Sequence, residues 1–220
     1  MSIPYRSKPT RNPVTGPLEI LNFWFADSLD SVDKLAGRQA VWFVPDPKFD
    51  NEIRARFHRL PDLAIGGDLD LWSNDVRNTL ALILVLDQFP RNMYRNTAHA
   101  FDYDSAALGL ARKVVDQDAH LDLHPIEQVF LFLPFEHSEA MDDQIRAVEL
   151  YRILAGRCLE PYEQAAQTAL DYANRHYDII ERFGRFPHRN AILDRVSTPE
   201  ERAFLESGGD TFGVVLPVDS

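Results

Sequence analysis

The chain has 220 residues, 45% of them hydrophobic, which suits a globular protein with one sizeable core rather than a disordered chain. A formal net charge of −11 disfavours nucleic-acid partners, because phosphates would be repelled. The longest apolar stretches, residues 80–86 and 129–135, are much shorter than the ~20 residues that cross a bilayer. Cys158 is the only cysteine, so an internal disulfide is excluded, and we expect a soluble, cytoplasmic protein without a membrane partner.

The N-terminal segment differs from the rest of the chain. Residues 1–17 contain Arg6, Lys8 and Arg11, several prolines and no acidic side chain. This composition predicts a flexible basic arm over residues 1–17, followed by a single domain over residues 18–220.

The remaining sequence predicts helices and no strands. Apolar residues recur every three or four positions over 163–183, which gives one face of a long helix, and Thr198 with Glu201 forms the pattern of a capping box. We find no alternating β-branched runs and no hairpin signal. Helices are expected over 18–25, about 32–40, 46–57, 71–88, 104–115, 125–132, 138–154, 163–183 and 198–206. The fold class is therefore all-α, a layered stack of antiparallel pairs with about nine helices.

One short motif occurs twice. Residues 89–92 read Phe-Pro-Arg-Asn, and residues 186–190 read Phe-Pro-His-Arg-Asn, each time after a long predicted helix. Proline is expected to end that helix, and the preceding phenylalanine to fill the core. The arginine then either pairs with an internal acid such as Asp87 or holds an anionic ligand, and the asparagine caps a helix or binds the ligand.

A second polar segment follows an apolar helix at Pro134, where His137 stands between Glu136 and Glu139. A carboxylate beside a histidine suits a general base, and Glu and His can bind a metal, but Ser138 capping the next helix, with His137 and Glu139 satisfying buried polar groups, explains the segment better. The spacing matches no metal-binding pattern that we know, so we predict no metal and no cofactor. The other histidines, at 58, 99, 120, 124 and 176, show no useful spacing and are expected on the solvated surface.

Five strings occur in this order: LNFWF (21–25), WF (42–43), LDQFPRN (86–92), PFEHSE (134–139) and GRFPHRN (184–190). With these strings, the chain resembles an uncharacterised bacterial family, domain of unknown function 924, from about residue 18 to residue 205. The resemblance implies a tetratricopeptide-like helical fold. It implies no activity, ligand or catalytic residue.

Three hypotheses for function remain open. In the first, the chain is a binding or scaffold protein with a polar pocket for a small anionic molecule or a peptide carboxylate. In the second, it is a hydrolase or lyase that uses His137 or His188 as general acid or base, oriented by Glu136 or Glu139. In the third, the motifs only terminate and cap helices. The predicted pocket residues are Arg91, Asn92, Glu136, His137, Glu139, Arg185, His188, Arg189 and Asn190.

Overall fold

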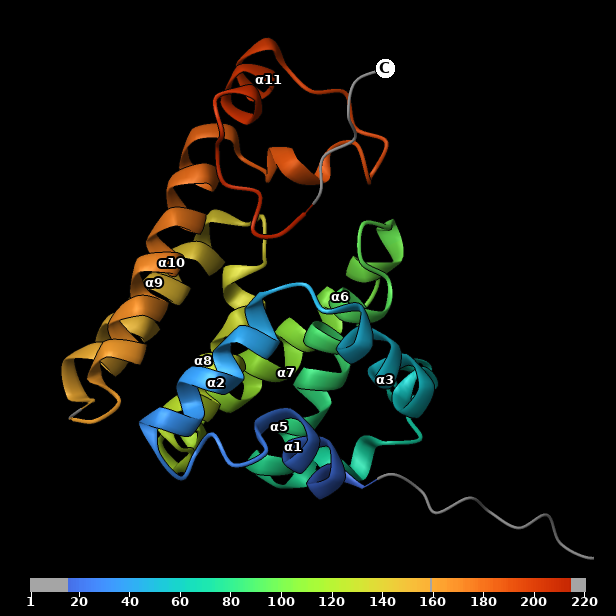
Figure 1. Ribbon diagram of the computed structural model, residues 1–220, viewed down its shortest axis with the longest axis vertical. Helices are drawn as coiled ribbons and strands as arrows, with labels where there is room; N and C mark the ends of the chain where they lie inside the picture. Colours follow the sequence, from blue (N-terminus) through green and yellow to red (C-terminus); the bar gives the residue numbers. More distant parts are fainter. Residues whose placement is uncertain (1–15, 159, 215–220) are drawn as a thin grey trace, which may run out of the picture.

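The computed structural model describes residues 16–158 and 160–214, and these form helices, turns and coil without a strand, which confirms the all-α class (Figure 1). The predicted basic arm lies outside the described residues, except that Gly16 and Pro17 are described and Pro17 begins the first helix. The α-helices are α1 (Pro17–Phe25), α2 (Val32–Phe43), α3 (Pro47–Phe57), α4 (Leu60–Ile65), α5 (Val76–Ile83), α6 (Phe89–Met93), α7 (Asp104–Asp116), α8 (Pro125–Glu136), α9 (Met141–Arg157), α10 (Glu163–Phe183) and α11 (Pro199–Glu206). Shorter turns are η1 (Asp70–Asn74), η2 (Leu84–Gln88), η3 (Ala98–Phe101), η4 (Ala119–Asp122) and η5 (Pro187–Arg189).

Helix starts follow the predicted capping chemistry. The Asp46 side chain accepts a hydrogen bond from the Lys48 backbone N–H at the start of α3. At α11, Thr198 and Glu201 form the predicted capping box, with both reciprocal bonds present. These side chains satisfy backbone donors that have no partner inside the helix, so local sequence is enough to place these two starts.

Pro90 does not end its helix as predicted, and the helix expected over 125–132 continues past Pro134. The chain winds into a π-helical turn over η2, and α6 then continues it through Pro90. The wider π turn places the Phe89 N–H on the Leu84 carbonyl, and the helical winding is kept past the proline. Pro134 likewise lies inside α8, where the next turn still closes because the His137 N–H donates to the Leu133 carbonyl at 2.8 Å.

The start of α9 also differs from the prediction. Ser138 does not cap it; the helix begins at Met141. The Ser138 hydroxyl instead donates to Asp143 at 2.7 Å and accepts a bond from the Ala140 backbone N–H. It therefore stabilises the turn that precedes the helix.

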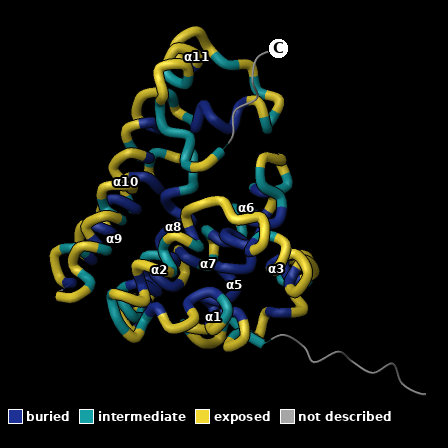
Figure 2. Tube along the Cα trace, in the orientation of Figure 1, coloured by how far each residue is buried: buried dark blue, intermediate teal, exposed yellow. Residues whose placement is uncertain are grey.

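The core is centred on α5 and α8. Every residue from Leu80 to Leu86 is buried, as the uninterrupted apolar run predicts (Figure 2). Trp24 of α1 and Trp42 of α2 pack on Phe130 of α8, with 4.6 Å between the ring centroids of Trp42 and Phe130. Burying each such side chain contributes about 1.5–3 kcal/mol. This aromatic contact fixes α2 against α8, which positions the wall of the groove described below.

Helices α8, α9 and α10 pack on one another in sequence order, and α9 and α10 lie side by side as the longest pair in Figure 1. Beyond α10, the chain turns through η5 to α11, near one end of this pair. The segment after α11 then returns along α10, where Arg175 forms an ion pair with Asp210. The segment after α11 thus contacts α10 at Arg175, inside the helix.

Candidate functional site

A groove with a volume of 940 Å³ runs between α2, α8, α10 and the segment 208–213. This volume suits a small-molecule site. Its walls are mainly apolar, with Leu35 and Trp42 from α2, Phe130 and Leu133 from α8, and Ala169 from α10. The lining also includes a set of polar side chains, here called the polar end of the groove: Gln88, Arg91, Asn92, Arg95, Glu136, His137, Tyr151, Arg175, His176 and Asp210. The groove thus has two chemically distinct parts.

The polar end contains a carboxylate–histidine pair. Asp87, in the π-helical turn η2, is fully buried, and its Oδ1 lies 2.8 Å from Nδ1 of His137 at the end of α8. Gln88 donates to the other carboxylate oxygen at 2.6 Å, and Arg91 approaches Oδ1 at 3.2 Å. Since an ionised carboxylate only accepts hydrogen bonds, the His137 Nδ1 carries the proton and Nε2 is left with a lone pair.

The electrostatics of this pair favour a neutral imidazole beside a charged carboxylate. Burial raises the pKa of Asp87, but the Arg91 charge, the His137 charge and the hydrogen bonds from His137 and Gln88 together outweigh it and hold that pKa below its usual range. Burial, and secondly the Arg91 charge, lower the pKa of His137. A histidine that is neutral at pH 7 and held by a carboxylate has the protonation state of a general base.

The first copy of the repeated motif is partly structural. Arg91 makes a two-pronged ion pair with Asp104, at 2.7 and 2.9 Å, in addition to its contact with Asp87. The internal pairing predicted for Arg91 is therefore confirmed. Asn92 does not cap a helix; it donates to Asp50 at 2.7 Å, and Arg95 binds the same carboxylate.

A second carboxylate–histidine pair lies beside the first. Glu136 Oε1 is 3.0 Å from Nδ1 of His176 on α10, and both side chains are almost fully buried. The prediction of a solvated His176 is wrong, as it is for His120, which is also buried. The sequence carried a signal, because His176 lies three residues after Ala173 and four before Ile180, on the apolar face of α10.

The other predicted site residues do not line the groove. Glu139 forms a two-pronged ion pair with Arg195 and accepts a bond from the Phe186 N–H at 2.8 Å. Arg185 pairs in the same way with Glu201, to which Asn190 also donates. These contacts close the turn between α10 and α11. A ligand-binding role for Glu139, Arg185 and Asn190 stays a prediction.

His188 and Arg189 are buried as well. Burial, and secondly the Arg189 charge, lower the pKa of His188 to about 3. The Arg189 guanidinium lies over the rings of Phe101 and Phe186, 4.8 and 4.4 Å from their centroids. Burial, and then the Arg91 charge, lower its pKa to about 10. A ligand-binding role for His188 and Arg189 stays a prediction.

The structure nevertheless brings the three polar segments together. The Asp87–His137 bond joins residues 86–92 to 134–139, and the bond from Phe186 to Glu139 joins 134–139 to 184–190. Arg91 also lies over the Phe101 ring that Arg189 contacts. The first two segments meet at the groove, and the third contacts the second without lining the groove.

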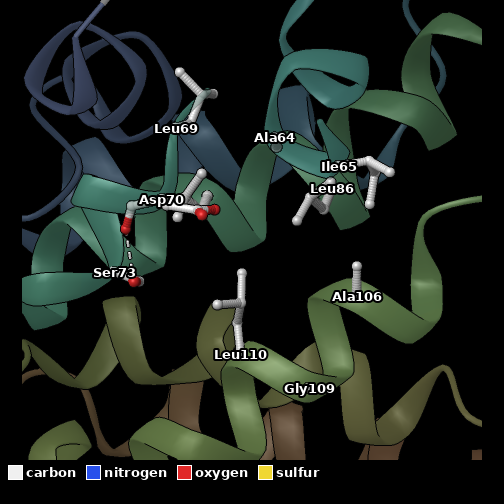
Figure 3. A pocket seen from close by; sticks show the side chains of 10 residues that line it. Ala64, Ile65, Leu69, Asp70, Ser73, Leu86, Ala106, Gly109 and Leu110 are labelled. Atoms are coloured by element: carbon white, nitrogen blue, oxygen red, sulfur yellow. Dashed lines mark hydrogen bonds between the residues drawn. The ribbon is translucent and has the colours of Figure 1, made fainter. Parts of the chain in front are cut away.

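A smaller pocket of 340 Å³ lies between α4, η1 and α7, and most of its lining is apolar (Figure 3). Ile65, Leu86 and Leu110 face it, and its polar edge is Asp70 with Ser73, whose hydroxyl donates to the Asp70 carbonyl at 2.7 Å. It contains none of the predicted site residues. The groove is therefore the candidate functional site.

Residues 16–158 and 160–214 contain no group of three or more His, Cys, Asp or Glu side chains placed to hold a metal ion. None of the helices in this part of the chain has the length and apolarity needed to cross a membrane.

Comparison with known proteins gives a family but no activity. No curated protein matches the chain. The structure of a protein of unknown function from Agrobacterium tumefaciens is similar, with a TM-score of 0.74 and 38% identity, over 87% of this chain and 97% of that chain. Residues 20–209 match the family described as "Bacterial protein of unknown function (DUF924)". The resemblance noted in the sequence is thereby confirmed, and the chain belongs to the DUF924 family.

Proposed function

We propose that the chain is a hydrolase that binds a small amphipathic molecule in the groove and uses His137 as general base. One observation carries the proposal: the 2.8 Å contact between His137 and the buried Asp87 lies at the polar end of a groove with apolar walls. The pair spans two helical segments, and η2 is a π-helical turn, a feature often found at functional sites.

Water is the nucleophile in this proposal. Among the described residues that line the groove, none is a serine or a cysteine. His137 Nε2 takes a proton from a bound water while the oxygen attacks an ester or amide carbonyl carbon. Asp87 keeps Nδ1 protonated and stabilises the imidazolium that forms, the usual part of a carboxylate behind a catalytic histidine.

The lining favours an apolar group attached to the reacting carbonyl. Trp42, Phe130 and Leu133 offer such a group a wall from which water is displaced. Arg91 and Arg95 reach the same groove, but each is neutralised by internal carboxylates. The predicted anionic ligand or peptide carboxylate therefore has less support here than an uncharged ester or amide.

The other hypotheses from the sequence make different predictions. A binding or scaffold protein would bind its ligand in the same groove without turnover. A purely structural role would need neither ligand binding nor turnover. The tetratricopeptide-like helix arrangement and the cytoplasmic location stay predictions beside this one. Turnover that depends on His137 separates the enzyme from both alternatives.

The test is hydrolysis of p-nitrophenyl octanoate by the purified full chain and by His137→Gln. We expect the variant to lower kcat/KM at least ~100-fold, the usual effect of removing a general base. The exposed His58 provides a matched control, since His58→Gln should hydrolyse the ester like the unmodified chain. Equal rates for the unmodified chain and a folded His137→Gln variant, or no hydrolysis above buffer, would overturn the proposal.

A further inference from the structure

The groove contains a second histidine that the proposed mechanism has not used. Nδ1 of His176 lies 3.0 Å from Glu136 Oε1 and 2.9 Å from the Tyr172 carbonyl oxygen. Both partners are acceptors, so Nδ1 carries a proton and Nε2 is the nitrogen that gains or loses one. His176 also lines the groove, so a bound molecule can reach it.

The two histidines are close enough to act on one bound group. The His137 and His176 ring centroids are 6.3 Å apart, with 65° between the ring planes. Their carboxylate partners lie on different elements, Asp87 in η2 and Glu136 at the end of α8. The site thus places two independently held imidazoles at the polar end of one groove.

The two carboxylates, Asp87 and Glu136, differ in their charged neighbours. Arg91 lies 3.2 Å from Asp87 and neutralises part of its charge, which weakens its hold on a protonated His137. The ion pair that Glu136 forms in the described structure is with His176 itself. Among the described ion pairs, Asp87 therefore has an arginine partner and Glu136 has none. Pairs of titratable groups in contrasting environments are how enzymes divide acid and base roles.

Other charged groups near His176 come from each element packed on it. Asp210, in the segment after α11, feels the His176 charge and pairs with Arg175 on α10. His188 of η5 lies close enough for its pKa to be lowered by His176. Phe212 stacks on the His176 ring at 3.6 Å between centroids and covers one of its faces. Glu136 and Asp210 are thus the acids that face this ring.

We propose that His176, held by Glu136, is the general acid that protonates the leaving group; this inference rests on the proposed hydrolase function. His137 Nε2 removes a proton from water, and the water oxygen forms a bond to the carbonyl carbon. The bond from that carbon to the leaving oxygen breaks, its electron pair stays on that oxygen, and His176 Nε2 supplies the proton. An acid and an alcohol leave, and solvent returns the proton from His137 to His176.

Two esters of one acid test this role. p-Nitrophenolate leaves as a stable anion and needs no acid, whereas an alkoxide leaves only when it is protonated. For His176→Gln we expect kcat/KM to fall at least ~100-fold with ethyl octanoate but less than about threefold with p-nitrophenyl octanoate. His137→Gln should lower both rates equally. Glu136→Gln, which keeps an acceptor for His176 without its charge, should show the same selective loss as His176→Gln.

The outcomes distinguish the two claims. Equal losses on both esters in a folded His176→Gln variant would mean that His176 is structural, and would overturn this inference while the role of His137 stands. A selective loss in His176→Gln together with unchanged rates in His137→Gln would overturn the assigned base and leave the acid. Failure of the unmodified chain to hydrolyse either ester would overturn both.

Discussion

His188 gives a prediction about stability that does not depend on function. Burial, and then the Arg189 charge, lower its pKa to about 3 in the folded chain, against about 6.5 in an unfolded chain. The pKa of His188 is lower in the folded chain than in the unfolded chain. Its contribution to the free energy of unfolding is therefore fully present above pH ~6.5 and is lost as the pH falls toward the folded pKa. At pH 5, about 1.5 units below the unfolded value, this one group costs about 2 kcal/mol.

The assay is urea unfolding at pH 8 and pH 5 for the unmodified chain, His188→Gln and the exposed control His58→Gln. The substitution at His188 lowers stability at both pH values, so the difference between them is the informative quantity. We expect this difference to be smaller by about 2 kcal/mol in His188→Gln and unchanged in His58→Gln. The buried histidines 120 and 137 also have lowered pKa values, but they contribute equally to all three proteins. The same pH dependence in His188→Gln and in the unmodified chain would refute the reasoning.

Three further predictions concern the last helix and the groove. Glu201→Gln should lower the free energy of unfolding by about 2–3 kcal/mol in urea denaturation, because it removes the buried carboxylate that pairs with Arg185. The control Glu200→Gln, at an exposed position, should change that free energy little. Asp87→Asn should lower kcat/KM for p-nitrophenyl octanoate about 10- to 100-fold, because the His137 tautomer is no longer fixed; an unchanged rate would remove Asp87 from the mechanism. Ala165→Trp should raise KM for p-nitrophenyl octanoate more than for p-nitrophenyl acetate, because the larger side chain narrows the groove beside its apolar wall. Equal effects on the two esters would mean that the acyl chain binds elsewhere.

Much of the fold follows from local sequence. The 163–183 helix has the bounds that its apolar spacing predicts, and Thr198 and Asp46 cap helices as expected. These signals act within one or two turns, so no knowledge of the rest of the chain is needed. The short helix α4 was missed because six residues around Pro61 give too little periodicity.

The features that were predicted wrongly, the effect of two prolines and the partner of His137, depend on tertiary contacts. Pro90 was expected to end a helix, and the 125–132 helix was expected to stop before Pro134, but both prolines lie inside helical segments. The partner of His137 is Asp87, 50 residues away, and not the neighbouring Glu136 or Glu139. Sequence proximity suggested the near carboxylates, and only the fold brings the distant one within hydrogen-bonding distance.

The repeated motif shows the limit of short patterns. Both phenylalanines, Phe89 and Phe186, are fully buried, as predicted. The arginines that follow these phenylalanines differ. Arg91 lines the groove, whereas Arg189 lies over two aromatic rings and does not line it. Similar residues in different local structures therefore have different surroundings.

The central claim is that His137 is a neutral base whose Nδ1 proton is held by Asp87. Imidazole ¹⁵N NMR of the labelled full chain at pH 7 measures this directly, with His137→Gln used to assign the signal. We predict a protonated Nδ1 and an unprotonated Nε2, and loss of this tautomer preference in Asp87→Asn. An imidazolium at pH 7, or a proton on Nε2 with Nδ1 bare, would contradict the account.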